Sequence, residues 1–499
     1  MKAKNKKNIL GFVICGIQLI VTIAFIVSVI MLGILPIKYV VIIGIVLLIF
    51  LALPFLNQLL CKKHLIPGRV LSIAMSIVIL AGSVYTTKAY SLFDKISNNN
   101  SKIDKMVVAV LKDDPAEKLK DAKSYDFGVQ YAIKSEDTKD VVDNINHKLK
   151  TTIQTHEFAN LNDQVKGLYD KDVDAIIYND AYTSVISESY EGFKEDIKII
   201  FSYEIVNRLE ETVTDSELDN ILEEPFTIYL SGIDVEGSIN TTGRSDVNIL
   251  ATVNPKTHEI LLVTTPRDYY IVLPGISNGR EDKLTHAGIY GVQASIDALA
   301  NLYEVDVDYY ARVNFTSLPH IVDALGGIDV ESEYEFDTHP FSGEVMHVNK
   351  GINHFNGAQA LVFCRERQNV PGGDFQRGRD QEAVITAMLK RAVSPAILTG
   401  ALDIFDSLND NIDTNMPPKQ IKGFIKKQIA EPSSWNITSM SADGTPNMRI
   451  TYSIPGVELS VCDPDYTSVN EIISAIDKVL AGEKLSGSEL IEDQKSSGE

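Results

Sequence analysis

Three apolar runs occupy most of the amino-terminal ninety residues, and they constrain the fold of this chain more than any other feature. The runs cover 8–32, 39–60 and 70–90, and each is about long enough to cross a bilayer as a helix. Three crossings place the two ends of the chain on opposite sides of a membrane. A cleaved signal peptide fits poorly, because the second and third runs follow closely and no small-residue cleavage pattern follows the first.

Basic residues flank these runs unevenly and predict their orientation. Residues 1–7 carry four lysines and the loop 61–69 carries two lysines and an arginine, whereas the loop before residue 39 offers only Lys38. By the positive-inside rule, the amino terminus and the second loop are cytoplasmic. We therefore expect a multi-pass protein of the cell membrane in which everything after Tyr90 is extracytoplasmic.

Charge divides along the same line. Residues 1–103 contain eleven Lys or Arg and one Asp, so they carry +10 of the formal net charge of −21 and the remainder carries −31. So acidic an extracytoplasmic part is repelled by nucleic acid, and no nucleic-acid partner is expected. Two of the four cysteines, Cys364 and Cys462, follow the membrane region; either they form a disulfide or they are two small buried side chains.

The pattern predicts four parts: a membrane region at 1–103, an extracytoplasmic accessory domain at 104–222, a larger α/β domain at 223–482, and a disordered polar tail at 483–499. In the accessory domain, short apolar runs alternate with amphipathic segments, which indicates a small α/β fold without a reactive cluster. The expected strands are 106–111, 127–133 and 173–178, and the expected helices are 138–151 and 158–169.

The larger domain is also expected to be α/β, with a central mixed sheet covered by helices. Its strand-like runs are nearly continuous apolar segments, as in a sheet that is covered on both faces. These runs are 226–230, 246–253 and 260–265, and the expected helices are 288–302, 315–325 and 381–392.

Arginines gather in the second half of this acidic chain. Guanidinium groups bind phosphates bidentately, so the cluster predicts a site for a discrete phosphate or pyrophosphate rather than for a bulk anionic surface. Arg267 closes an expected strand, and Arg365 and Arg367 follow another at 361–363. Arg377 and Gln381 are four residues apart on one face of a helix whose expected N-cap is Asp374. That helix terminus itself favours an anion.

Two carboxylates adjoin neighbouring strands of the expected sheet. Asp234 follows the first strand and Asp246 begins the next. Mg²⁺ is commonly held by one or two carboxylates together with substrate phosphates, so Asp234 and Asp246 are the candidate metal ligands, for Mg²⁺ or Mn²⁺.

An ordered series of short motifs resembles the LytR-CpsA-Psr family, and the three apolar runs before an accessory domain resemble its capsule-locus, CpsA-type branch. The catalytic domain of that family would cover about 224–482. The motifs are Gly-Arg-Ser-Asp (243–246), Thr-Pro-Arg-Asp (265–268), Lys-Leu-Thr-His-Ala (283–287), Leu-Gly-Gly-Ile-Asp-Val (325–330), Arg-Glu-Arg (365–367) and Asp-Phe-Gln-Arg (374–377) followed by Gln381.

This resemblance implies an enzyme that transfers a glycopolymer, here capsular polysaccharide, from an undecaprenyl pyrophosphate or phosphate carrier to peptidoglycan. Other capsule-assembly proteins are possible partners. Carried over by motif, the metal ligands are Asp234 and Asp246, the pyrophosphate clamp is Arg267, Arg365, Arg367 and Arg377, and the orienting residues are Asp374 and Gln381. Asp234, Asp268 and Asp374 remain alternative general bases.

One position departs from the family pattern, and one rival function stays open. Many members have an arginine directly before the glutamine, where this chain has Asp380; Arg379 lies one residue earlier, rotated by about 100° on a helix. The rival is a non-catalytic membrane regulator that binds the lipid carrier and sets the length of the capsule polymer, since the same pocket could bind without turnover. A DNA-binding transcription factor is disfavoured by the topology and by the acidic charge.

Overall fold

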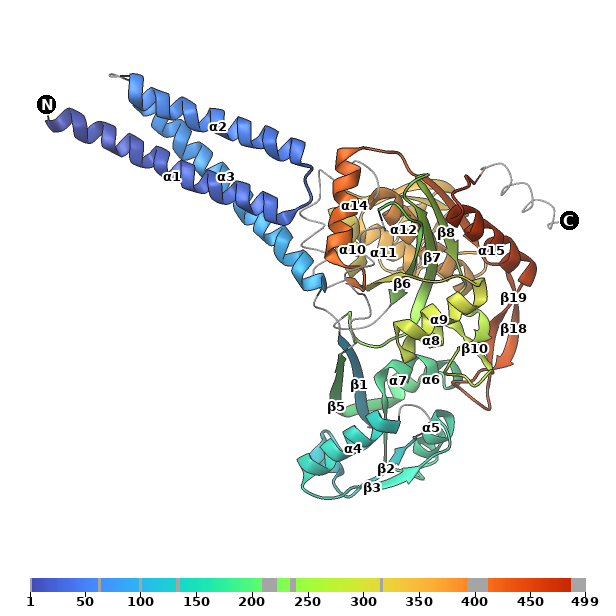
Figure 1. Ribbon diagram of the computed structural model, residues 1–499. Coiled ribbons are helices and arrows are strands. Elements are labelled where there is room, and N and C mark those ends of the chain that lie inside the picture. Colours follow the sequence, from blue (N-terminus) through green and yellow to red (C-terminus); the bar gives the residue numbers. More distant parts are fainter. Residues whose placement is uncertain are drawn as a thin grey trace. The chain divides into compact units, whose positions relative to one another are not determined.

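A computed structural model describes residues 2–61, 64–97, 101–131, 135–208, 222–233, 239–314, 317–392 and 412–485. The chain divides into two compact units (Figure 1). The first holds the amino-terminal helices together with helix α14 (Pro418–Ala430), and the second holds the remaining described residues. The expected disordered tail at 483–499 lies almost wholly outside the described residues.

Three long helices contain the three apolar runs. They are α1 (Lys2–Leu32), α2 (Ile37–Leu60) and α3 (Ile66–Ser97), and the parts apolar enough to span a membrane are Ile9–Leu32, Ile37–Leu60 and Ile66–Ser91. At most 22 % of each span is buried, so most apolar side chains point outward, as lipid requires. Between helices the contacts include polar ones, such as the 2.6 Å bond that the Ser72 hydroxyl donates to Gln18 Oε1.

Helix α14 belongs to this first unit although it lies late in the sequence. Ile421 and Ile425 pack on Leu32 and Ala89, and Lys38 Nζ donates a 2.9 Å hydrogen bond to the carbonyl oxygen of Ala430. A segment within the expected range of the larger domain thus folds with the membrane helices.

The accessory domain contains a five-stranded sheet. Its strands are β1 (Ser101–Leu111), β2 (Asp126–Val129), β3 (Gln154–Glu157), β4 (Ala175–Asn179) and β5 (Ile197–Arg208), in the order β3-β2-β4-β1-β5. β3, β2 and β4 are parallel, whereas β1 is antiparallel to both of its neighbours. The helices are α4 (Ser135–Leu149), α5 (Leu161–Tyr169), α6 (Thr183–Ser189) and α7 (Phe193–Asp196).

Strand β1 separates two hydrophobic cores because its side chains alternate between the faces of the sheet. Met106 and Val108 belong to the core that contains residues of α4, whereas Val107 belongs to the core that contains residues of α5 and α6. The second core also includes Ile289 and Ile454 of the carboxy-terminal domain. The two domains of this unit therefore share apolar packing.

The carboxy-terminal domain contains the mixed sheet that the sequence predicts. Its strands are β6 (Phe226–Ile233), β7 (Ser245–Asn254), β8 (Glu259–Thr264), β11 (Tyr309–Asn314), β16 (Ile412–Thr414) and β17 (Asn436–Ser441), in the order β16-β11-β6-β7-β8-β17. The pairs β11/β6 and β8/β17 are parallel and the other pairs are antiparallel. Residues of α9 (Val292–Tyr303) and α15 (Tyr466–Leu480) join those of β7 and β8 in one core.

Two expected elements differ from the structure. The segment 288–302 forms two helices, α8 (Leu284–Tyr290) and α9, which are separated at Gly291, where φ is +119°. The expected strand at 361–363 is wrong: these residues lie in helix α11 (Gly357–Arg365). A capping box between Asn356 and Gln359 starts that helix, and a run of three apolar residues does not by itself distinguish a strand from a buried helix.

The remaining helices of this domain lie near the expected positions. Helix α10 covers Leu318–Ala324 and α12 covers Asp374–Ala392, and α11 packs against both. Small antiparallel pairs complete the domain: β9 (Tyr270–Val272) with β10 (Glu281–Lys283), β12 (Ile328–Ser332) with β15 (Gly351–Phe355), β13 (Phe336–Asp337) with β14 (His347–Val348), and β18 (Gly444–Ile450) with β19 (Glu458–Pro464). Cys364 and Cys462 are free and buried, so no disulfide joins them.

Candidate functional site

The site lies at one edge of the mixed sheet. In the register, Ile233 at the end of β6 pairs with both Asn314 at the end of β11 and Ser245 at the start of β7. β8 runs toward the same edge, and its last residue, Thr264, pairs with Ile249 in the middle of β7. The carboxyl ends of β6 and β11 therefore lie at the edge where β7 begins, next to Asp246, and ligand sites are usual at the carboxyl ends of strands.

Arg267 and Asp246 are in direct contact at this edge. Arg267 Nη1 donates to Asp246 Oδ1 over 3.1 Å, and Arg267 Nε lies 3.6 Å from Asp268 Oδ2. The three side chains are 12–19 % exposed, so they are largely screened from water but still reachable. Because the guanidinium is held by two carboxylates, its orientation is fixed before any ligand arrives.

Two further arginines act on Asp246. Burial tends to raise the pKa of this carboxyl, but Arg244, Arg267 and Arg377 outweigh that effect and lower the pKa below its ordinary value. Arg377 comes from α12, and Arg244 precedes β7, so three segments bring cations to one carboxylate. That concentration of positive charge is suited to phosphate oxygens.

The motif at 283–287 contacts the loop that carries Arg267 and Asp268. The backbone N–H of Thr285 donates to the carbonyl oxygen of Arg267 over 2.8 Å, which fixes the loop that carries Arg267. Lys283 Nζ lies 3.3 Å from Asp268 Oδ1 and is only 5 % exposed. His286 is fully buried and shares a 2.7 Å hydrogen bond with Asp282, which is a structural role rather than a contact with the cluster.

Arg365 and Arg367 occupy an exposed stretch at the end of α11. The buried Glu366 between them accepts hydrogen bonds from the backbone N–H groups of Arg367, Gln368 and Asn369 over 2.7–3.0 Å, which fixes this turn. Burial tends to raise the pKa of Glu366, but the backbone hydrogen bonds lower it overall.

Helix α12 carries the other candidates. Gln381 Nε2 donates to the carbonyl oxygen of Cys364 over 3.2 Å, which joins α12 to the residue before Arg365. Arg379, which lies one residue before the family's usual arginine position, is 43 % exposed and donates to Glu333 over 3.1 Å and to Gln376. Asp374 is the first residue of the helix and not, as expected, its N-cap; the N-cap is Gly373, whose carbonyl oxygen accepts from the Arg377 N–H. The Asp374 side chain lies outside the described residues.

The predicted metal site is described only in part. Asp234 lies outside the described residues, although the preceding Ile233 pairs with Ser245, which precedes Asp246. Within the described ranges no group of three or more His, Cys, Asp or Glu residues is arranged to hold a metal ion. Asp246 offers carboxylate oxygens of the kind that Mg²⁺ prefers, and substrate phosphates would have to complete the set.

Three charged residues of the group around Asp246 and Arg267 were not among the candidates chosen from the sequence. Arg244 and Lys283 lie in motifs that the sequence analysis quotes, so their basic charge beside Asp246 and Arg267 was a usable signal. Glu188 was not recognisable: it belongs to α6 of the accessory domain, and it contacts both Arg244 and Lys283.

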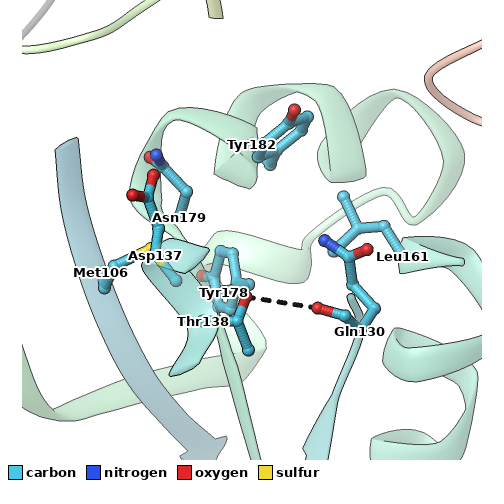
Figure 2. A pocket seen from close by; sticks show the side chains of 8 residues that line it. All are labelled: Met106, Gln130, Asp137, Thr138, Leu161, Tyr178, Asn179 and Tyr182. Atoms are coloured by element: carbon cyan, nitrogen blue, oxygen red, sulfur yellow. Dashed lines mark hydrogen bonds between the residues drawn. The ribbon is translucent and has the colours of Figure 1, made fainter. Parts of the chain in front are cut away.

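A cavity in the accessory domain is a separate feature (Figure 2). It has a volume of about 10 Å³, room for about one water molecule, and its walls include Gln130, Thr138 and Asn179. The Thr138 hydroxyl donates a 3.2 Å hydrogen bond to the carbonyl oxygen of Gln130 across this region. So small a cavity cannot hold a glycolipid.

The fold and the cluster together define an α/β protein with three apolar amino-terminal helices and a group of arginines and carboxylates at one sheet edge. Comparison with known proteins identifies the family to which the chain belongs. Residues 199–461 match the LytR_cpsA_psr family, and the chain belongs to this LytR-CpsA-Psr family.

Individual relatives share part of the chain. The polyisoprenyl-teichoic acid–peptidoglycan teichoic acid transferase TagU of Bacillus anthracis is 37 % identical over 199 residues, which are 40 % of this chain and 63 % of that protein. TagU of Bacillus licheniformis is 34 % identical over 215 residues, or 43 % and 67 % of the two chains. This chain thus spans less than two thirds of the Bacillus anthracis relative.

The solved structures that are similar to this chain match about half of its length. The crystal structure of Bacillus subtilis TagU is 28 % identical and covers 53 % of this chain and 100 % of that chain, with a TM-score of 0.40. The Streptococcus agalactiae protein gbs0355 is 28 % identical and covers 53 % and 90 %, with a TM-score of 0.43.

Proposed function

We propose that this protein transfers a glycopolymer from a polyprenyl pyrophosphate or phosphate carrier to peptidoglycan, and that the polymer is capsular polysaccharide. The observation that carries the proposal is the convergence of Arg244, Arg267 and Arg377 on Asp246 from three segments of the chain. Surface arginines have no reason to converge in this way. The names of the TagU relatives support the reaction class and specify teichoic acid as their own polymer.

In the proposed reaction a hydroxyl group of the wall glycan attacks the phosphorus atom that bears the polymer. The bond to the bridging oxygen of the pyrophosphate breaks, the polyprenyl phosphate leaves, and the hydroxyl proton passes to a carboxylate at this edge. Negative charge grows on the leaving phosphate and on the oxygens of the transferred phosphoryl group. The guanidinium group of Arg267 is already oriented by Asp246 and Asp268, so it stabilises this charge without rearranging.

We further propose that Asp246 and Asp234 hold one Mg²⁺ or Mn²⁺ ion against the pyrophosphate. The ion would neutralise phosphate charge and polarise the reacting phosphoryl group. The β6/β7 register supports this proposal, since it pairs the residues that precede the two aspartates. Full activity of the wild type in excess chelator would remove the metal from the mechanism.

The deciding experiment uses full-length protein in liposomes, an undecaprenyl pyrophosphate-linked polymer and isolated peptidoglycan. The polymer retained on the wall and the polyprenyl phosphate released are measured together. A lysine cannot reproduce the arginine fork, and a charge-assisted hydrogen bond contributes about 1.5–3 kcal/mol, so Arg267→Lys should slow transfer by roughly tenfold or more. Supplying capsular and teichoic acid polymers in parallel identifies which one is accepted.

Arg449→Lys is the matched control. Arg449 also pairs with a carboxylate, Asp463 at 2.8 Å, but it is 49 % exposed and lies on β18. This variant should transfer polymer at the wild-type rate. If Arg267→Lys also attaches polymer at the wild-type rate, the clamp is not catalytic and the protein is better explained as a regulator of polymer synthesis.

A further inference from the structure

We propose that Glu188 of the accessory domain is a positioning residue of the phosphate site, which holds Arg244 and Lys283 of the carboxy-terminal domain in the orientation that the reaction needs. The accessory domain thereby completes the site. The catalytic part of this inference rests on the proposed function, whereas the geometric part does not.

Glu188 contacts both cations directly, with one carboxylate oxygen for each. Oε1 accepts from Arg244 Nη1 over 2.7 Å, and Oε2 accepts from Lys283 Nζ over 2.6 Å. Both distances are those of charge-assisted hydrogen bonds, the stronger kind in proteins. The Glu188 side chain is 23 % exposed and Arg244 is 18 % exposed, so the contacts are largely sheltered from solvent.

The contacts continue to the centre of the site. Lys283 Nζ lies 3.3 Å from Asp268 Oδ1, and Asp268 Oδ2 lies 3.6 Å from Arg267 Nε. Arg267 in turn donates to Asp246 over 3.1 Å. Positive and negative groups therefore alternate without interruption from α6 of the accessory domain to the arginine that we place on the pyrophosphate.

A carboxylate is required at this place for two reasons. Lys283 is only 5 % exposed, and a buried ammonium group is costly unless it is paired. Arg244 and Lys283 bind the same carboxylate, and without it the two like charges repel each other. Burial tends to raise the pKa of Glu188, but Lys283, His286 and Arg244 outweigh it and lower the pKa, so the group is ionised at neutral pH.

The position of α6 relative to the site is fixed by apolar packing. Val185 and Ile186 of this helix share a buried core with Ile289 and Ile454 of the carboxy-terminal domain. Burial of apolar side chains of this size stabilises the contact between the two domains.

The segment that carries Arg244 is also tied to the accessory domain. The backbone N–H of Thr242 donates to the carbonyl oxygen of Ile103, and the N–H of Ile103 donates to the carbonyl oxygen of Asn240, both over 2.9 Å. The Thr242 hydroxyl donates to the buried Asp104 over 2.9 Å. The segment that precedes Arg244 is therefore bonded to the accessory domain, and the Arg244 side chain binds Glu188 of the same domain.

A first experiment tests the contact between Glu188 and Lys283 through the chemical reactivity of the lysine, without measuring enzyme activity. The full-length protein is acetylated with a lysine-reactive ester, and the rate at each lysine is followed by mass spectrometry. Lys283 should be protected in the wild type and modified about tenfold faster in Glu188→Gln, with Lys105, which is 37 % exposed, as the internal reference. Glu191→Gln, an exposed glutamate three positions further on, should leave Lys283 protected. Unchanged protection of Lys283 in Glu188→Gln overturns the proposal.

A second experiment reads the reaction in the liposome assay. Glu188→Gln should lower kcat by about tenfold while KM changes less than threefold, because the cations remain but are misplaced. Glu188→Asp, which keeps the charge, should recover part of kcat, and Glu191→Gln should match the wild type. If Lys283 becomes reactive while kcat is unchanged, Glu188 is not a positioning residue. If the wild type transfers no polymer, the proposed function fails, and the acetylation result still decides the geometry.

Discussion

Asp380 is a buried carboxyl group, and we expect its titration to make the stability of the protein depend on pH. It lies on α12 directly before Gln381 and is 2 % exposed. Gln376 donates to Oδ1 over 2.9 Å, whereas Oδ2 has no hydrogen-bond partner within the described part of the chain. Burial raises the pKa of Asp380 to about 7; the Gln376 bond and Arg379 act to lower it, and Glu333 and Glu366 act to raise it.

The size and direction of the effect follow from linkage. The ordinary pKa of the group is 3.8 and its pKa in the folded protein is about 7. Between these values the folded protein keeps a proton that the unfolded chain has lost, so the free energy of unfolding falls as the pH rises. At about 1.36 kcal/mol for each pKa unit, the loss is complete above the folded pKa and is on the order of 4 kcal/mol.

Asp380→Asn tests this reasoning because asparagine has the same shape and is neutral at every pH. At pH 5 the variant and the wild type should have similar stability. At pH 8 the variant should be more stable, by an amount on the order of 1–4 kcal/mol. Glu382, whose pKa burial raises to about 8, still titrates in the variant, so some loss of stability with rising pH remains.

The assay is denaturant unfolding of the full-length protein in detergent, followed by circular dichroism at pH 5, 6, 7 and 8. Asp463→Asn is the control, because the bond from Arg449 lowers the pKa of Asp463 and that group is ionised throughout this range. The control should therefore run parallel to the wild type. If Asp380→Asn is also parallel to the wild type from pH 5 to 8, burial of this carboxyl does not govern the pH dependence.

Three further predictions concern the site, the sheet and the membrane. A Cβ atom on Gly288 would lie 2.6 Å from a backbone oxygen next to Arg244, so Gly288→Ala should slow polymer transfer. Gly378→Ala is the control, because nothing lies within 4 Å of a Cβ atom at that position. The control should leave transfer unchanged and raise the unfolding free energy by about 0.5–1 kcal/mol. Arg312 is buried, and its Nε donates to Asp413 Oδ2 over 2.8 Å. Asp413→Ala removes this carboxylate, so denaturant unfolding should show that the free energy of unfolding falls by about 3–5 kcal/mol. A decrease below about 1 kcal/mol would contradict a stabilising role of the buried pair. Alkaline phosphatase fused after about residue 100 should be active, and an active cytoplasmic reporter there instead would reverse the proposed orientation.

The sequence alone determined the features that depend on local pattern. The three apolar helices could be predicted because a helix that spans a bilayer needs about twenty apolar residues and bonds every backbone group internally. The strands at 226–230, 246–253 and 260–265 were readable because a covered sheet demands nearly continuous apolar runs, and the structure has β6, β7 and β8 there. Charge and motif order pointed to Arg267, Arg377 and Asp246, which lie together.

Tertiary structure decided the elements whose local pattern fits two answers. Residues 361–363 are helical because the capping box at Asn356 starts α11 and because Phe363 packs against Phe336 and Phe355. The break between α8 and α9 depends on the left-handed region that Gly291 adopts, and a stripe of apolar residues passes through such a break unchanged.

Tertiary structure alone decided how the accessory domain meets the site. Glu188 is 95 residues from Lys283 in the sequence, and its own segment shows nothing but an ordinary amphipathic pattern. An ion pair of this kind exists only where two separately folded surfaces dock, and here the docking depends on the apolar core that α6 shares with Ile289 and Ile454. Local sequence specifies which side chains carry charge, but which charges meet is decided by the packing that brings distant segments together.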